Sequence, residues 1–137
     1  MLKKLGLVDL HASIKQKIED KTGLMAYDHV PEDMPSPFYF IEVVVDKRPE
    51  DTKVMWCEVF TVWIHAIAEA GKSKIAIYDM IEKLEEALTE ELILPEEIDI
   101  LRQSEVGMQS LQEDETGEMH AIVAYEIKVS YGFKVKI

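Results

Sequence analysis

Residues 54–66 restrict the fold of this chain more than any other part of the sequence. Side chains along a strand alternate between two faces, and here both faces are largely apolar: Phe60 and Ile64 lie on one, Val59 and Trp63 on the other. A strand with two apolar faces must be covered on both sides, so the pattern predicts a central strand. We expect a helix to cover one face, and a neighbouring subunit is one candidate for the other.

The remaining segments predict two helices and several further strands. Leu10, Ile14 and Ile18 recur at every fourth position, which places them on one stripe of a helix over residues 9–22. Asp9 is the expected N-cap of this helix, and Gly23 is expected to end it in a left-handed conformation. The other predicted elements are an amphipathic helix over 74–91 that Ser73 caps, a short extended segment over 24–27, and strands over 38–45, 98–111 and 119–137.

The last strand has the clearest alternation in the chain. One face is expected to be apolar from Ala121 through Tyr125 and Val129 to Phe133 and Val135, while charged residues occupy much of the other. Together these elements predict an α+β fold, a mostly antiparallel sheet with two helices packed on one face. The length of 137 residues and the lack of repeats or linkers indicate one domain over residues 1–137.

Composition excludes several classes of function. The chain has 15 Lys and Arg residues against 27 Asp and Glu, a net charge of −12, so phosphate backbones repel it and we expect no direct nucleic-acid binding. No apolar run is long enough to cross a membrane, and the N-terminus lacks the pattern of a signal peptide. The single cysteine fits synthesis in a cytosolic, reducing compartment.

The sequence offers no convincing catalytic or metal-binding group. Cys57 and His65 share a face of the central strand, but eight residues at about 3.3 Å each separate them by roughly 26 Å. Asp28 and His29 are adjacent, and on an extended segment their side chains point apart, so we expect no direct contact between them. We therefore predict no enzymatic activity, no cofactor and no metal.

The distribution of charge is the feature most informative about function. Residues 90–118 contain ten acidic side chains and a single basic one, Arg102, whereas residues 119–137 carry a net charge of +2. An acidic and a basic flank on one small chain favour head-to-tail self-association, in which unlike patches meet. Ordinary solubilising charge explains the same pattern equally well.

Four sequence segments resemble the tail-completion proteins of long-tailed bacteriophages and prophages, the group of tail terminators and tail-to-head joining proteins. They are YDHVP at 27–31 and MPSPFYFI at 34–41, which match a proline-rich loop of that family, then EVFTVWI at 58–64 and the helix start KIAIY at 74–78. The resemblance covers most of the chain, and its motifs consist largely of residues that make the fold. Residues 90–101 are longer and more acidic than the family pattern.

The resemblance implies a structural protein that assembles with itself into a ring, commonly a hexamer, and contacts the tail tube protein and the head connector proteins of a virion or phage-like particle. Two loops and the basic last strand are the expected contact regions. The candidate residues are Arg48, Glu50 and Asp51 in the loop over 46–53, Glu113, Asp114 and Glu115 in an acidic turn that could line a lumen, and Lys128 and Lys134 in the last strand.

Two other classes of function stay open at this point. An acidic monomeric adaptor that binds a basic partner, much as a DNA mimic does, fits the net charge. A small enzyme that uses Cys57 or His29 fits less well, because no catalytic group survives the geometry. Within the resemblance, the sequence does not separate a terminator of the tail tube from a protein that joins tail to head.

Overall fold

The computed structural model describes residues 2–30, 35–71 and 73–135, apart from the side chain of Val44. These residues form the expected combination of helices and strands. The elements are α1 (Leu7–Thr22), β1 (Ala26–Tyr27), β2 (Phe38–Pro49), β3 (Met55–Ala68), α2 (Lys74–Ala87), β4 (Asp99–Glu113) and β5 (Met119–Phe133).

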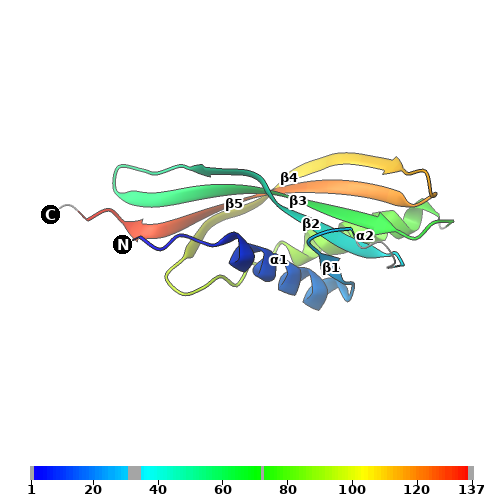
Figure 1. Ribbon diagram of the computed structural model, residues 1–137, viewed down its shortest axis with the longest axis horizontal. Coiled ribbons are helices and arrows are strands. Elements are labelled where there is room, and N and C mark those ends of the chain that lie inside the picture. Colours follow the sequence, from blue (N-terminus) through cyan, green and yellow to red (C-terminus); the bar gives the residue numbers. More distant parts are fainter. Residues whose placement is uncertain (1, 31–34, 72, 136–137) are drawn as a thin grey trace.

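The strands form one sheet in the order β1-β2-β3-β5-β4. Every pair of neighbours is antiparallel except β1 and β2, which are parallel. Two long hairpins, β2–β3 and β4–β5, make the sheet elongated and twisted, and both helices lie on one side of it (Figure 1). The predicted α+β fold, with a mostly antiparallel sheet and two helices on one face, is confirmed.

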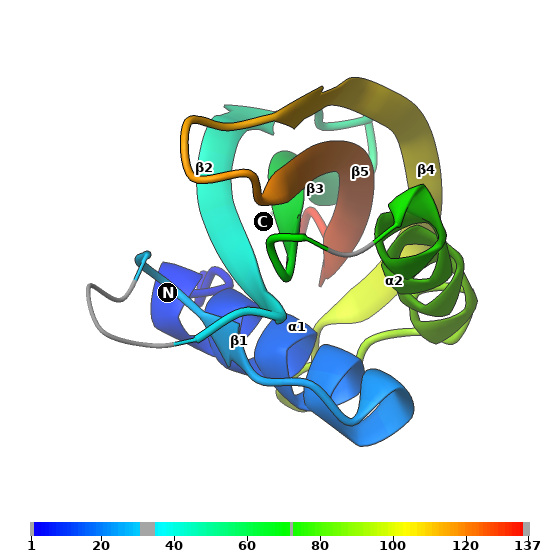
Figure 2. The same cartoon turned by 90° about the vertical axis from the view of Figure 1, so that its right-hand side faces the viewer.

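Strand β3 is central, as its two apolar faces predict. It lies between β2 and β5, and Phe60, Val62 and Ile64 point into the core that the helices close. The helices contribute Leu10, Ile14 and Ile18 from α1, and Ile77, Met80 and Leu84 from α2, all of them buried. The end view in Figure 2 shows α1 beneath the sheet and α2 along its β4 side.

Two buried tyrosine hydroxyls connect the sheet to other parts of the chain. Tyr39 on β2 donates a hydrogen bond to the backbone oxygen of Met80 in α2 at 2.7 Å, and burial raises the pKa of Tyr39. Tyr131 on β5 donates to Glu58 at 2.6 Å and accepts a hydrogen bond from the backbone nitrogen of Leu5 at 3.1 Å. The carboxylate of Glu58 is therefore buried with a partner, as a buried charge requires.

The helix ends differ from prediction. Helix α1 begins at Leu7 with Gly6 as its N-cap, so the predicted cap at Asp9 is wrong and Asp9 lies in the first turn. The predicted left-handed end at Gly23 is confirmed, with φ of 76°. Helix α2 ends at Ala87 instead of 91, because the side chain of Gln103 in β4 donates hydrogen bonds to the carbonyl oxygens of residues 88 and 90 and holds the chain against the sheet.

Two strand predictions also need correction. Strand β2 continues to Pro49, because its residues 46–49 pair with β3 across residues 58–61; the predicted loop over 46–53 is thus shorter, with an irregularity between Glu42 and Asp46. Strand β5 ends at Phe133, and its last apolar residues are not buried: Phe133 is 73% exposed and Val135 is 82% exposed. The core of the described residues therefore does not include this end of the predicted strand. Residues 136–137 lie outside the described part.

In the described part of the chain, no helix is long and apolar enough to cross a membrane.

Replacement of Phe60 by alanine tests whether β3 holds the core together. Phe60 is fully buried, so Phe60→Ala should lower the free energy of unfolding by about 3–5 kcal/mol, measured by urea denaturation. Val8→Ala is the matched control, because Val8 is 82% exposed on α1 and its truncation should change stability by less than about 0.5 kcal/mol. Similar losses in both variants would contradict this description of the core.

Candidate functional site

Three of the predicted contact residues, Arg48, Glu50 and Lys128, form an ion-paired cluster over β3, which we call the arch. On the sheet face away from the helices, Arg48 of β2 and Lys128 of β5 flank Val59 of β3 in the strand register. Glu50 joins them, with a carboxylate oxygen 2.9 Å from Lys128 Nζ and another 3.7 Å from a guanidinium nitrogen of Arg48. The hydrogen bond from Lys128 lowers the pKa of Glu50.

The arch explains how the second apolar face of β3 is covered. Val59 is completely buried although both α1 and α2 lie on the other side of the sheet, and Cys57 on the same face as Val59 is also buried. The aliphatic stems of long charged side chains can cover apolar surface while their charged ends stay in water. The chain therefore covers this part of the face with its own side chains, and no neighbouring subunit is needed there.

Asp51 and Lys134 form a second contact at the same end of the molecule. One oxygen of Asp51 accepts a hydrogen bond from the backbone nitrogen of Cys57 at 2.9 Å, and the other lies 3.6 Å from Lys134 Nζ. Lys134 Nζ also lies 4.6 Å from the centre of the Trp56 ring, within the range of a cation–π contact. Five of the eight predicted contact residues thus gather near the β2–β3 hairpin, where they contact one another within one chain.

The other three predicted residues are Glu113, which ends β4, and Asp114 and Glu115 in the turn that follows; this turn lies at the opposite end of the long axis (Figure 1). Asp114 shapes this turn: its Oδ1 accepts hydrogen bonds from the backbone nitrogens of Thr116 and Glu118 at 2.9 and 3.0 Å. Hydrogen bonding from Thr116 lowers the pKa of Asp114. Glu113 and Glu115 are exposed beside it.

Sequence reasoning missed three members of the charged network. Asp46 pairs with Arg48, and Glu126 pairs with Arg102 of β4 and lies 3.9 Å from Arg48. Only the strand register brings these residues together, because Glu126 lies 78 positions after Arg48. Their signal in the sequence was the charged face of the last strand, which does not reveal the partner strands.

One histidine prediction was wrong and one histidine contact was missed. His29 Nδ1 lies 2.7 Å from Asp28 Oδ1, because residues 28 and 29 lie in a bend instead of an extended segment. Both side chains are about two-thirds exposed or more.

The missed contact links three strands on the sheet face away from the helices. His65 of β3 is 6% exposed, its Nδ1 lies 2.7 Å from His120 Nε2 on β5, and its Nε2 contacts Glu42 on β2. The ring of Phe40 packs 4.7 Å from that of His65 between the centroids. Burial, and then the charge of His65, lower the pKa of His120, while Asp114, Glu118 and Glu42 act in the opposite direction.

Within the described residues, no group of three or more His, Cys, Asp or Glu side chains is arranged to hold a metal ion. Cys57 is buried and lies at the far end of β3 from His65. The side chains that contact one another most closely are instead the charged residues of the ion-paired networks on the sheet.

The fold is shared with a protein of known structure. A chain in a solved structure titled "Virion of native gene transfer agent (GTA) particle" has the same fold, with a TM-score of 0.71 at 16% sequence identity; the match covers 90% of the present chain and 96% of the other.

The chain belongs to a phage tail terminator family. The family is described as "Putative tail termination protein", and it matches residues 1–137. The protein is therefore a phage tail structural protein. Comparison with curated proteins found no match.

Acidification tests the environment of His120. A pKa below the usual value of about 6.5 means that the folded protein binds fewer protons than the unfolded chain, so stability is full above that pH and falls as the pH drops below it. Between about pH 7.5 and pH 5.5, the wild type should lose more unfolding free energy than His120→Gln, in which the amide can still donate to His65. The unfolding free energy of His29→Gln should fall over this pH range as much as that of the wild type. An equal fall in all three proteins would contradict the lowered pKa of His120.

Proposed function

We propose that this protein caps the end of a phage tail tube as a ring of identical copies. The observation that carries the proposal is the match of the whole chain, residues 1–137, to a family of tail termination proteins. Such a cap works by contact: it occupies the surface on which the next tube subunit would add. The role needs no cofactor and no reaction chemistry.

A ring requires a heterologous contact, in which one patch of each copy meets a different patch of the next. The sequence carries unlike charges, because residues 90–118 are strongly acidic and residues 119–137 carry net positive charge. Within one chain, Lys128 and Lys134 of the second segment already pair with Glu50 and Asp51. The remaining faces of the ring would contact the tail tube protein on one side and a head connector protein on the other. Assembly would take place in the bacterial host cytoplasm and end in a virion or phage-like particle.

The acidic charge also suits a ring through which DNA passes. A net charge of −12 repels phosphates, so DNA would slide without sticking. The β4–β5 turn is our candidate for the lumen, because Glu113 and Glu115 are exposed there while Asp114 fixes the shape of the turn. The sheet face away from the helices is a poorer candidate, since its charges are paired with one another.

Electron microscopy of an induced lysate tests the proposal. In a strain that carries the phage or prophage but lacks this gene, the tail tubes should grow to uncontrolled lengths. Re-expression of the wild-type chain from a plasmid is the control and should restore uniform tails.

Two outcomes would contradict capping. Tails of normal length beside unattached full heads would indicate a joining protein instead. Complete particles would remove the role in morphogenesis and favour the acidic adaptor that binds a basic partner.

A further inference from the structure

A groove between α2 and β4 combines an apolar floor with an acidic rim. It has a volume of about 420 Å³, and its apolar lining includes Tyr78 and Ile81 from α2 and Met108 from β4. Tyr78 and Met108 are each about half exposed, 46% and 54%. The carboxylates of the rim are Glu82, Glu85 and Glu105.

The rim carries negative charge that the described part of the chain does not neutralise. Among the described residues, no Lys, Arg or His lies within ion-pair distance of Glu82, Glu85 or Glu105, whereas Asp79 on the same helix pairs with Lys83 at 3.1 Å. Burial and the charges of Glu105 and Glu82 raise the pKa of Glu85. Glu105 accepts only a long hydrogen bond from the Tyr125 hydroxyl, 3.3 Å. The groove therefore fits a partner that brings both a cation and an apolar side chain.

The tip of the β2–β3 hairpin has that chemistry. Lys53 is exposed and has no ion-pair partner among the described residues, and the adjacent Val54 is 59% exposed. The tip is not isolated, because the backbone nitrogen of Lys134 donates a hydrogen bond to the carbonyl oxygen of Val54 at 2.7 Å. The exposed Phe133 lies beside it, paired with Met55 in the strand register. The hairpin tip, residues 52–54 with Phe133 beside them, thus presents one cation without a partner among the described residues, Lys53, next to exposed apolar side chains.

We propose that the hairpin tip of one copy docks into the α2–β4 groove of the next copy, with Lys53 against the rim carboxylates and Val54 against the apolar floor. The inference rests on the proposed function for its premise that copies of this chain meet, and it names the two surfaces that do so. The contact is complementary in charge, which favours a defined register and partner.

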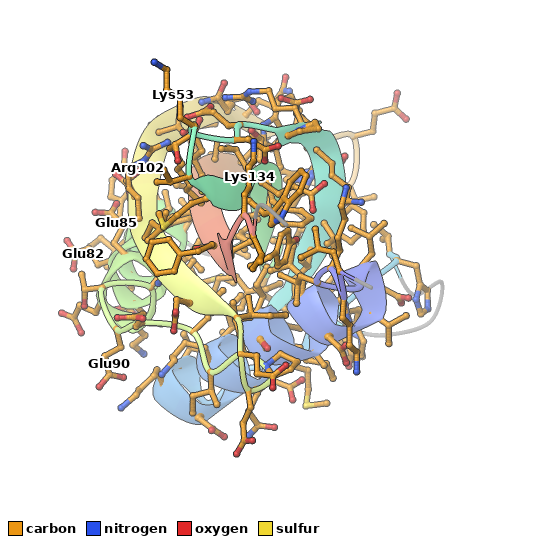
Figure 3. All side chains as sticks on the ribbon, turned by 90° about the vertical axis from the view of Figure 1, so that its left-hand side faces the viewer. Lys53, Glu82, Glu85, Glu90, Arg102 and Lys134 are labelled. Atoms are coloured by element: carbon orange, nitrogen blue, oxygen red, sulfur yellow. The ribbon has the colours of Figure 1, made fainter. Side chains whose placement is uncertain are left out.

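The two surfaces lie on different parts of the molecule, as a head-to-tail contact requires. In Figure 3, Lys53 and Lys134 lie on the end of the molecule that faces the viewer, whereas Glu82 and Glu85 project from α2 at its flank. Each copy would therefore use one surface and leave the other free for the next copy, and contacts of this kind close into a ring when the rotation permits.

The free edge of β4 does not offer a simpler contact. Its pairing with β5 is irregular at three places, between residues 100 and 102, 105 and 107, and 108 and 110. Such bulges twist an edge and discourage strand addition by another chain. A side-chain contact in the groove is thus the better way for β4 to meet a neighbour.

Disulfide cross-linking of the full-length chain tests the docking. Val54→Cys combined with Met108→Cys keeps every charge of both surfaces, and the natural Cys57 is buried and should stay unreacted. Under mild oxidation, non-reducing electrophoresis should show a ladder beyond dimers, since each copy links to two neighbours. Either single variant should stop at dimers.

Val8→Cys combined with Met108→Cys is the matched control, because Val8 is exposed on α1 away from the hairpin tip and should give no ladder. Addition of Lys53→Glu to the Val54→Cys/Met108→Cys protein should abolish its ladder, and further addition of Glu85→Lys should restore it. A ladder equally strong in the control, only dimers in the test protein, or a ladder insensitive to Lys53→Glu would overturn the proposal.

The result is separable from the proposed function. If the ladder is missing but deletion of the gene still gives overlong tubes, capping stands and the docking surfaces are wrong. If the ladder forms but tails stay normal without the gene, the surfaces stand and the ring serves another role.

Discussion

The need to bury β3 on both faces determines most of this structure. The face with Phe60 and Ile64 is closed by α1 and α2, which is why both helices lie on one side of the sheet. The face with Val59 is closed by Arg48, Glu50 and Lys128 reaching from the neighbouring strands. Because the chain covers the part of β3 around Val59 with its own side chains, we look for the surfaces that meet other molecules at the ends of the sheet and along β4.

The periodicity of apolar residues was enough to predict the fold class, the central position of β3 and the buried stripes of both helices. Contacts that depend on register were out of reach: Glu126 meets Arg48, and Glu42, His65 and His120 meet across three strands, only because the sheet places them so. The same dependence on strand register explains why the predicted contact residues were found to pair within the chain. Arg48 and Glu50 were predicted in a loop and Lys128 in the last strand, but sequence alone does not show that they neutralise one another. Phe133 and Val135 were assigned to the apolar face of the last strand, and both are exposed, because alternation does not reveal where the core ends along a strand.

The distinction between paired and unpaired charge connects the structure to its proposed role. Near the hairpin, most charges are used within the chain and cover apolar surface; in the groove and at Lys53, the described residues provide no partner. Heterologous assembly uses two unlike surfaces whose charges have no partner among the described residues, here the groove and the hairpin tip with Lys53. Because the two surfaces are separate, each copy can offer its hairpin tip to one neighbour and its groove to another. In the proposed role, a protein that caps a tube by contact needs two such unlike surfaces and, in addition, a surface that repels DNA.

Cryo-electron microscopy of intact particles that encode this chain tests the central claim most directly. The account predicts a closed ring of this protein at the head-proximal end of the tail tube, with the hairpin tip of each copy in the α2–β4 groove of its neighbour. Density for the chain as isolated copies, or at the distal end of the tail, would contradict the account.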